Sequence, residues 1–420
     1  MHEVLAQRLF ATGSVLDNHC QQRGRAAFRF PLASLLGLLS VCCLSSESLD
    51  GSKSSGSLGA EWEAESGRSP EDSAAEPDVG MEAGVPPEGS RAALPVFLVS
   101  VDGMAARFVD SGIAAGELPM FRRLQKEAAW THNARTVVGS TRTLPNHISM
   151  LTGRPAALQS GMAESVPHSY LKNVNTSGDV TLHNAGNSEL SYVHSVFDVL
   201  HDRGLRTGFF AGKKKFNLLR RSCNEVQGSE DLEGEDHGRN KIDHALIDQE
   251  KPTEELVTHM LEHCSHSHVD FVFKHIRDLD KAGHSTGWGS EEYASALRKV
   301  DKQLARIRDF LTDSTGANKR GYLMVTSDHG GQGMGHGDPE LAEDYTIPFY
   351  LWGPDVPAGV DLYDLVDESR VDPRTSQVPF ISGIPQPIRN ADVANLALAL
   401  LRIDETVPGS VGTVLWTPPH

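Results

Sequence analysis

The stretch PVFLVSVDGM (95–104) joins a short, mostly apolar run to an aspartate, Asp102. A continuous apolar run of this length is typical of a β-strand that is buried on both faces. Four further segments share the pattern and are predicted as strands: TGFFAG (207–212), VDFVFKHI (269–276), GYLMVTS (321–327) and IPFYLWG (347–353).

Amphipathic segments separate these runs and predict helices. Gly204 closes one over 194–203, another begins after Pro252, and a late apolar helix covers 392–401. Ser290 is predicted as an N-cap. The helix that it opens places six apolar residues on one face: Tyr293, Leu297, Val300, Leu304, Ile307 and Leu311. Strands alternating with helices predict an α/β fold, with a mostly parallel central sheet and helices on both faces.

The N-terminal part has a different composition. FPLASLLGLLSVCC (30–43) follows three arginines, has the length of a signal-peptide core, and is too short to span a bilayer. We therefore predict a signal peptide or N-terminal anchor over 1–44 and export to the periplasm, the cell surface or the medium. Cys42 follows Leu-Ser-Val, so a lipoprotein with a membrane tether stays open.

Residues 45–93 are rich in Ser, Gly, Glu and Pro and are predicted to form a disordered linker. The catalytic domain is then expected over 94–420. The formal net charge of -17 argues against general nucleic-acid binding, which depends on excess Lys and Arg. Two of the five cysteines, Cys223 and Cys264, lie in the expected domain, where they could pair or stay separate. The oligomeric state cannot be read from the sequence.

Three aspartates follow three of the predicted strands, namely Asp102, Asp280 and Asp328. The carboxyl ends of strands form the sites of open α/β sheets. Three histidines come soon after two of the aspartates: His284, His329 and His336. A single Asp there is often a turn or helix cap, and a single loop His is usually solvated. Six such groups together favour a centre for divalent metal ions such as zinc.

A hydroxyl nucleophile is available in STRTLPNH (140–147). Metal coordination would activate the Thr143 hydroxyl, and a helix beginning near Pro145 would point its amides at a bound anion. Asn146 could hydrogen-bond a phosphate oxygen. The alternative is that Thr143 only caps a helix.

Five motifs in this order resemble those of the alkaline phosphatase superfamily: VDGM (101–104), TLPNH (143–147), D-x-x-G-H (280–284), SDHGG (327–331) and GHG (335–337). The TLPNH element is most similar to the nucleotide pyrophosphatase/phosphodiesterase branch. The resemblance implies two divalent metal ions, with zinc favoured. One metal ion would be held by Asp102, Thr143, Asp328 and His329, and the other by Asp280, His284 and His336. It also implies that Thr143 attacks phosphorus and that Asn146 stabilises the transition-state oxygens.

The implied function is hydrolysis of a small phosphate ester, either a phosphodiester or a nucleotide pyrophosphate, through a phospho-threonine intermediate. His336 lies closer to the Asp328-His329 pair than the last ligand does in vertebrate members, which leaves the substrate class open. The alternatives are a phosphomonoesterase, a phosphonate hydrolase or a non-catalytic binding protein on this fold. A sulfatase would need C/S-x-P-x-R and a serine hydrolase G-x-S-x-G, and both strings are absent.

Two further segments have competing interpretations. GGQGMGHG (330–337) follows a strand but contains His336 and does not open an apolar helix, so we interpret its glycines as letting the backbone wrap around a metal site. Lys213, Lys214 and Lys215 could neutralise a phosphate, but a run of lysines is more often a solvated loop.

Overall fold

The computed structural model describes residues 93–158, 166–315, 320–381 and 383–419. All of them belong to one compact unit, Gly84–His420. The predicted signal peptide or anchor over 1–44 and most of the predicted linker lie outside the described residues. Among the helices of the described part, none is long and apolar enough to cross a bilayer.

One eight-stranded sheet forms the centre of this unit, in the order β4-β3-β5-β1-β6-β7-β2-β8. All neighbouring pairs are parallel except those that β7 makes with β6 and β2. The predicted mostly parallel α/β sheet is therefore confirmed. The strands are β1 (Val96–Val101), β2 (Ala129–Arg135), β3 (Thr207–Ala211), β4 (His244–Ile247), β5 (Phe271–Ile276), β6 (Tyr322–Thr326), β7 (Thr346–Trp352) and β8 (Val360–Asp361).

The five predicted strands correspond to β1, β3, β5, β6 and β7. In β1 the side chains of Phe97 and Val99 join one apolar cluster, while those of Val96 and Leu98 join the other. A strand that is buried on both faces needs apolar residues at successive positions, which explains its continuous pattern. The strands β2, β4 and β8 were not predicted.

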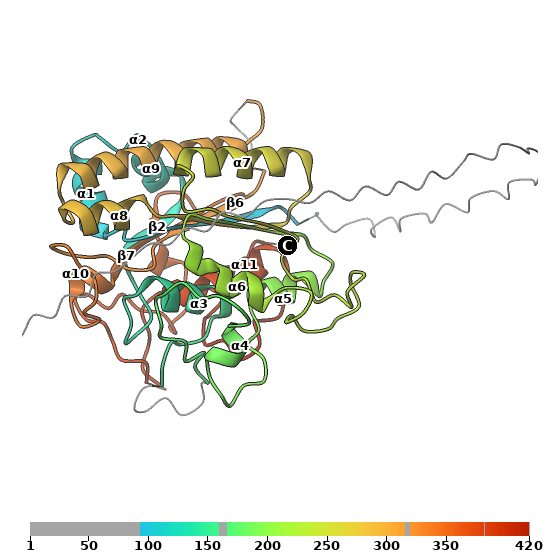
Figure 1. Cartoon of the computed structure of the whole chain (residues 1–420). Coiled ribbons are helices and arrows are strands. Elements are labelled where there is room, and N and C mark those ends of the chain that lie inside the picture. The colour runs from blue at the N-terminus through green and yellow to red at the C-terminus, as the bar shows by residue number, and fades with distance from the viewer. Residues whose placement is uncertain (1–92, 159–165, 316–319, 382, 420) are drawn as a thin grey trace, which may run out of the picture. The chain divides into compact units, whose positions relative to one another are not determined.

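Helices cover both faces of the sheet (Figure 1). One face carries α1 (Ala106–Ala114), α2 (Pro119–Glu127), α7 (Thr253–His266), α8 (Asp278–Thr286) and α9 (Glu291–Phe310). The other carries α3 (Thr143–Thr152), α4 (Leu182–Ala185), α5 (Val196–His201), α6 (Asn217–Ser222) and α11 (Val393–Leu400). Shorter elements are α10 (Ala342–Tyr345) and the 3-10 helices η1 (Lys214–Phe216), η2 (Leu362–Asp364) and η3 (Asn390–Asp392).

The predicted cap of the longest helix is confirmed, because the Ser290 side chain accepts a hydrogen bond from the backbone N–H of Tyr293 at the start of α9. Cys223 is buried and Cys264 is half-buried, and both are free thiols. Of the two states that the sequence left open for these cysteines, the structure has the unpaired one.

Candidate metal centre and nucleophile

Four neighbouring parallel strands, β3, β5, β1 and β6, end beside one another and supply the site. Asp102 directly follows β1, Asp280 lies in the first turn of α8 after β5, and Asp328 lies just beyond β6. Backbone contacts fix their spacing: Asp280 N–H donates to Asp102 O at 3.0 Å, and Gly103 N–H donates to Asp328 Oδ1 at 3.1 Å. The three predicted carboxylates therefore converge at one edge of the sheet.

The three predicted histidines lie at the same place, and each has its ring orientation fixed by the backbone. The Nδ1 atoms of His284, His329 and His336 lie 3.0, 2.8 and 2.6 Å from the carbonyl oxygens of Met334, Gly330 and Thr141. A carbonyl oxygen only accepts, so each Nδ1 carries the proton. Each Nε2 is then the ring atom that could bind a metal, the arrangement that backbone carbonyls commonly impose on metal-binding histidines, and the Nε2 atoms of His284 and His336 lie 3.1 Å apart.

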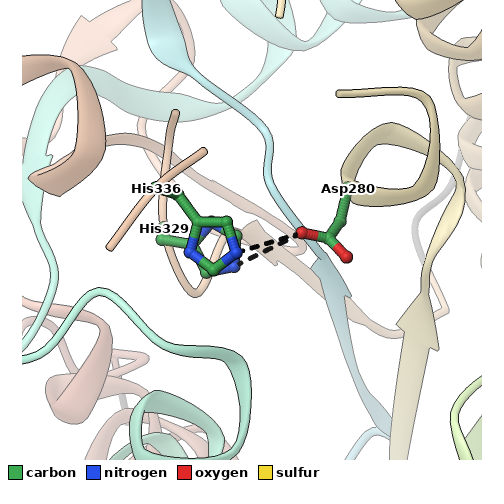
Figure 2. Close-up of side chains that lie close together, drawn as sticks. All are labelled: Asp280, His329 and His336. Carbon is green, nitrogen blue, oxygen red and sulfur yellow. Dashed lines mark ion pairs between the residues drawn. The ribbon is translucent and has the colours of Figure 1, made fainter. Parts of the chain in front are cut away.

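These Nε2 atoms face the carboxylates. Figure 2 shows Asp280 Oδ1 opposite His329 and His336, at 3.9 and 3.4 Å, with the two imidazole rings stacked 3.6 Å apart. His284 Nε2 lies 3.2 Å from the same oxygen. His329 Nε2 is also 3.3 Å from both Asp102 Oδ1 and Asp328 Oδ2.

Four buried atoms at this point make no hydrogen bond within the described chain: Asp102 Oδ1, Asp280 Oδ1, Asp328 Oδ2 and His329 Nε2. Buried polar atoms without partners are costly, and these four point toward one another. Three groups of side chains among the described residues have the spacing to hold a metal ion, and two of them lie here: Asp102-Asp328-His329 and Asp280-His329-His336. The donor set of carboxylate and imidazole fits divalent cations, zinc among them.

The cluster also brings Thr143 into place. Thr143 is the first residue of α3, and the N-cap position is Arg142, so the alternative that Thr143 caps the helix is wrong. The carbonyl of Thr141 accepts the Nδ1–H of His336, which ties the turn before Thr143 to a candidate ligand. The Nδ1–H of His147 donates to Thr143 O at 2.7 Å and lies 3.6 Å from Asp328 Oδ2. The start of α3 is thus held between two of the candidate ligands.

Asn146 requires a correction. Its Nδ2 donates to Ser140 O at 2.8 Å and to Arg142 O at 3.2 Å, while its Oδ1 accepts from the Val137 N–H and from Asn390 Nδ2. Both amide hydrogens are engaged, so this geometry does not fit the direct contact to a phosphate oxygen that we expected. Its role is to hold the turn before α3.

A different side-chain amide, that of Asn173, could donate to a phosphate oxygen, which is the role expected of Asn146. The Oδ1 of Asn173 accepts the Leu144 N–H at 3.0 Å and the Lys215 ammonium at 2.9 Å. No described residue accepts a hydrogen bond from its Nδ2, which leaves a donor beside the first turn of α3. No sequence pattern distinguishes this residue, since a lone Asn in a polar loop is ordinary.

The side chain of Lys213 is not solvated, in contrast to our preferred interpretation of the lysine run. Its side chain is only 17% exposed, and its Nζ lies 2.5 Å from Asp102 Oδ2 and 2.6 Å from Asp280 Oδ2. His275, on β5, has its Nε2 2.9 Å from Asp102 Oδ2. Lys214 is 54% exposed, as expected. His275 was overlooked because a polar residue near the end of an apolar strand has no distinctive spacing.

The charges in the site are strongly coupled. Burial opposes ionisation of Asp102, but the Lys213 ammonium and the His275 and His329 rings hold the pKa of Asp102 well below its usual range. Burial and the Asp102 carboxylate raise the pKa of Asp328. Burial opposes protonation of His329, yet the adjacent Asp328 and Asp102 carboxylates raise the pKa of His329 above its ordinary value. Without metal, the Asp328-His329 pair therefore retains protons that a metal ion would displace.

Trp288 joins the loops that carry the ligands. Its indole N–H donates to Gly103 O at 3.0 Å, next to Asp102. A methyl group on Gly283 or Gly331 would lie 2.5 or 2.3 Å from the Trp288 ring. Only glycine lets the ring pack this closely against α8 and the loop after β6. Gly331 and Gly333 have φ of 153° and 54°, which supports our interpretation that these glycines let the backbone wrap around the site.

Comparison with known proteins agrees with this geometry. Residues 96–345 match the model of the type I phosphodiesterase / nucleotide pyrophosphatase family. Ectonucleotide pyrophosphatase/phosphodiesterase family member 1 of Mus musculus is 28% identical over 257 residues, covering 56% of this chain and 24% of the relative. The Homo sapiens protein is 25% identical over 240 residues, covering 56% and 23%. The chain thus matches about a quarter of the length of these relatives.

The fold has a solved counterpart. Human ectonucleotide pyrophosphatase / phosphodiesterase 5 superposes with a TM-score of 0.51 at 15% identity, covering 76% of this chain and 97% of that one. This likeness shows that the two proteins share a fold, and the family match over residues 96–345 confirms the resemblance to the alkaline phosphatase superfamily. The family match spans more than half of the 420 residues and includes every candidate ligand together with Thr143. This chain belongs to the type I phosphodiesterase / nucleotide pyrophosphatase family.

Proposed function

We propose that the chain hydrolyses phosphodiester or nucleotide pyrophosphate bonds of small substrates, with two divalent metal ions and a phospho-threonine intermediate at Thr143. The observation that carries the proposal is the set of buried carboxylate oxygens and imidazole Nε2 atoms that face one another beside the start of α3. One ion would be held by Asp102, Asp328 and His329 with Thr143, and the other by Asp280, His284 and His336. His329 lies close enough to both groups to serve either.

Divalent cations would supply Lewis-acid polarisation of the phosphate and would lower the pKa of the nucleophile. In the first half-reaction the Thr143 oxygen would form a bond to phosphorus and pass its proton to solvent, while the leaving oxygen departs with the P–O electron pair. In the second, water would attack the same phosphorus and lose a proton, while the Thr143 oxygen leaves with the P–O electron pair and takes up a proton. The Thr143 N–H at the start of α3 and the Nδ2 of Asn173 are the protein groups that would donate to the phosphate oxygens, since the Leu144 N–H already donates to Asn173 Oδ1.

The test compares Thr143→Ala with Thr152→Ala, a threonine in the last turn of the same helix. Each protein is assayed for zinc content and for hydrolysis of bis-p-nitrophenyl phosphate, p-nitrophenyl phosphate and a p-nitrophenyl phosphonate. We expect Thr143→Ala to retain zinc and to lose at least roughly 10³-fold in kcat/KM, because the nucleophile is absent. Thr152→Ala should turn over like the parent.

The substrate panel separates the alternatives. Preference for the diester supports the proposal, whereas preference for the monoester or the phosphonate would assign one of the related activities. Full zinc occupancy without turnover of any ester would indicate a binding protein. Unchanged activity of Thr143→Ala would refute the nucleophile. Export from the cytoplasm stays a prediction from the N-terminal sequence.

A further inference from the structure

A lysine ammonium lies inside the candidate metal centre. Lys213 follows β3, the strand next to β5, and its Nζ bridges Asp102 Oδ2 and Asp280 Oδ2 at 2.5 and 2.6 Å. The two carboxylates are 0% and 8% exposed, so solvent screens these contacts little. Lys213 is therefore part of the charge balance of the centre.

The two oxygens of each carboxylate have different partners. In Asp280, Oδ2 faces Lys213, whereas Oδ1 faces His284, His329 and His336. In Asp102, Oδ2 accepts from both Lys213 and His275, whereas Oδ1 faces His329. The ammonium thus occupies the sides of the carboxylates that the imidazoles leave open. A cation bound at Oδ1 of Asp102 or Asp280 would lie on the opposite side of that carboxylate group from the Lys213 ammonium.

This arrangement has opposite consequences with and without metal. Three buried carboxylates within 4 Å of one imidazole nitrogen, His329 Nε2, are unfavourable by themselves, and an ammonium placed between two of them offsets part of that charge. Once divalent cations bind the same carboxylates, the ammonium is a like charge a few ångströms away in a desolvated site, where repulsion is much stronger than in water.

We propose that Lys213 is the resident counter-ion of the metal-free centre, which stabilises the empty site and lowers its affinity for metal ions. The inference rests on the proposed metal centre. It assigns Lys213 a positioning and charge-balancing role on two ligands, rather than contact with the reacting phosphate.

The experiment compares the full chain with Lys213→Met, which keeps the length of the stem and removes the charge, and with Lys214→Met, its exposed neighbour. Chelator-treated proteins are titrated with zinc against a chromophoric competitor, and thermal unfolding is followed with and without zinc. We expect Lys213→Met to bind zinc at least roughly tenfold more tightly and to melt at a lower temperature when metal-free. With zinc bound, it should melt close to the parent. Lys214→Met should match the parent in every measurement.

An ordinary structural ion pair would behave differently. It would lower the melting temperature with and without zinc and leave the zinc affinity unchanged, and that result would overturn the proposal. Weaker zinc binding by Lys213→Met would overturn it as well. If the parent itself binds no zinc, the proposed metal centre fails rather than the role of Lys213.

Lys213→Gln and Lys213→Arg guard against a variant that does not fold. The glutamine variant should repeat the effects of methionine, and the arginine variant, which keeps the charge, should retain the parent's metal-free melting temperature. A methionine or glutamine variant that folds only with zinc supports the proposal, because the metal then replaces the ammonium. Failure of both to fold even in excess zinc would overturn it.

Discussion

At the scale of single residues, Asn146 in the first turn of α3 and Asn173 beside that turn have different partners, although the sequence pointed to Asn146 as the donor to a phosphate oxygen. Asn146 is fully buried and uses its whole carboxamide on protein groups, among them the Val137 N–H and Ser140 O. Asn173 is half-buried and keeps its Nδ2 free of the described residues while its Oδ1 holds the Leu144 N–H. One amide therefore builds the turn, and the other offers a donor to a substrate.

This contrast predicts separable effects of two substitutions. Asn173→Ala should lower kcat/KM for bis-p-nitrophenyl phosphate by roughly 10²-fold, since it removes a donor to the transition-state oxygens. Its loss of unfolding free energy should be smaller than that of Asn146→Ala, because Asn173 is half-buried and water can replace the acceptor that the Leu144 N–H loses. Asn146→Ala should cost about 1–3 kcal/mol of stability, because the Val137 N–H and Asn390 Nδ2 lose an acceptor. Steady-state kinetics and urea unfolding measure the two. An Asn173→Ala enzyme as active as the parent would remove this residue from the site.

At the scale of elements, Trp288 connects three ligand-bearing segments: the turn after β1, α8 and the loop after β6. We expect Trp288→Ala to weaken zinc binding by about 10-fold or more, the range typical of lost outer-shell support. Trp288→Phe keeps a ring between Gly283 and Gly331 but loses the hydrogen bond to Gly103 O, so its effect should be intermediate. Competitive zinc titration checks the order, and equal affinity in all three proteins would contradict it.

His168 predicts how stability responds to acid. Its Nδ1 accepts the Tyr170 N–H at 3.1 Å, so Nε2 carries the proton toward Ser149 Oγ at 3.0 Å, and the buried ring is neutral. Burial lowers the pKa of His168 to about 3. In the unfolded chain the ring binds a proton near pH 6.5. The neutral His168 ring therefore makes its full contribution to the free energy of unfolding above that pH. This contribution is lost at up to about 1.4 kcal/mol per pH unit as the pH falls toward 3.

His168→Gln should therefore flatten the decline of unfolding free energy with acid, measured by urea unfolding across this pH range. His266→Gln, at an exposed position, should leave the slope as it is in the parent. A His168→Gln slope equal to that of the parent would show that this ring is already protonated in the fold.

The same scale shows what the sequence could and could not predict. β1, β3, β5, β6 and β7 were identifiable because strands buried on both faces have continuous apolar patterns. β2 (AWTHNAR) was missed, since its middle is polar and only half-buried, with a register shift between Thr131 and Ala134 opposite β7. These residues form a strand because they pair with β7 and β8, and the local sequence pattern carries no information about that pairing.

The candidate ligands could be predicted because the sheet topology brings the ends of their strands together. Each aspartate follows a parallel strand, and β5, β1 and β6 are neighbours, so their carboxyl ends meet. His275 and Asn173 were not predictable, because an isolated polar residue has the same local pattern whether it is solvated or directed into a site. The run that contains Lys213 was noticed, but a solvated loop was the preferred interpretation. Only the tertiary arrangement separates the buried Lys213 from the exposed Lys214.

At the scale of the whole molecule, the centre connects distant parts of the chain, since it joins the segments after β1, β5 and β6 and the start of α3. Unfolding separates these candidate ligands, so a bound metal ion would bind the folded state selectively and its binding energy would add to stability. At a free zinc concentration about 1,000-fold above Kd, each proposed site would contribute about 4 kcal/mol, which would raise the melting temperature by on the order of 10 °C.

The size of that shift should depend on pH in a fixed direction. The pKa values of Asp328 and His329 are raised in the metal-free site, by burial and Asp102 in the first case and, against burial, by Asp328 in the second. Metal binds the deprotonated forms, so protons compete more strongly as the pH falls. Scanning calorimetry with zinc and with chelator should thus give a larger difference in melting temperature at about pH 9 than at about pH 6. The protein with chelator reports all metal-independent effects of pH on the melting temperature. The difference between the two scans therefore reports only the effect of pH on metal binding. A difference that grows toward acid would mean that Asp328 and His329 do not bind the metal.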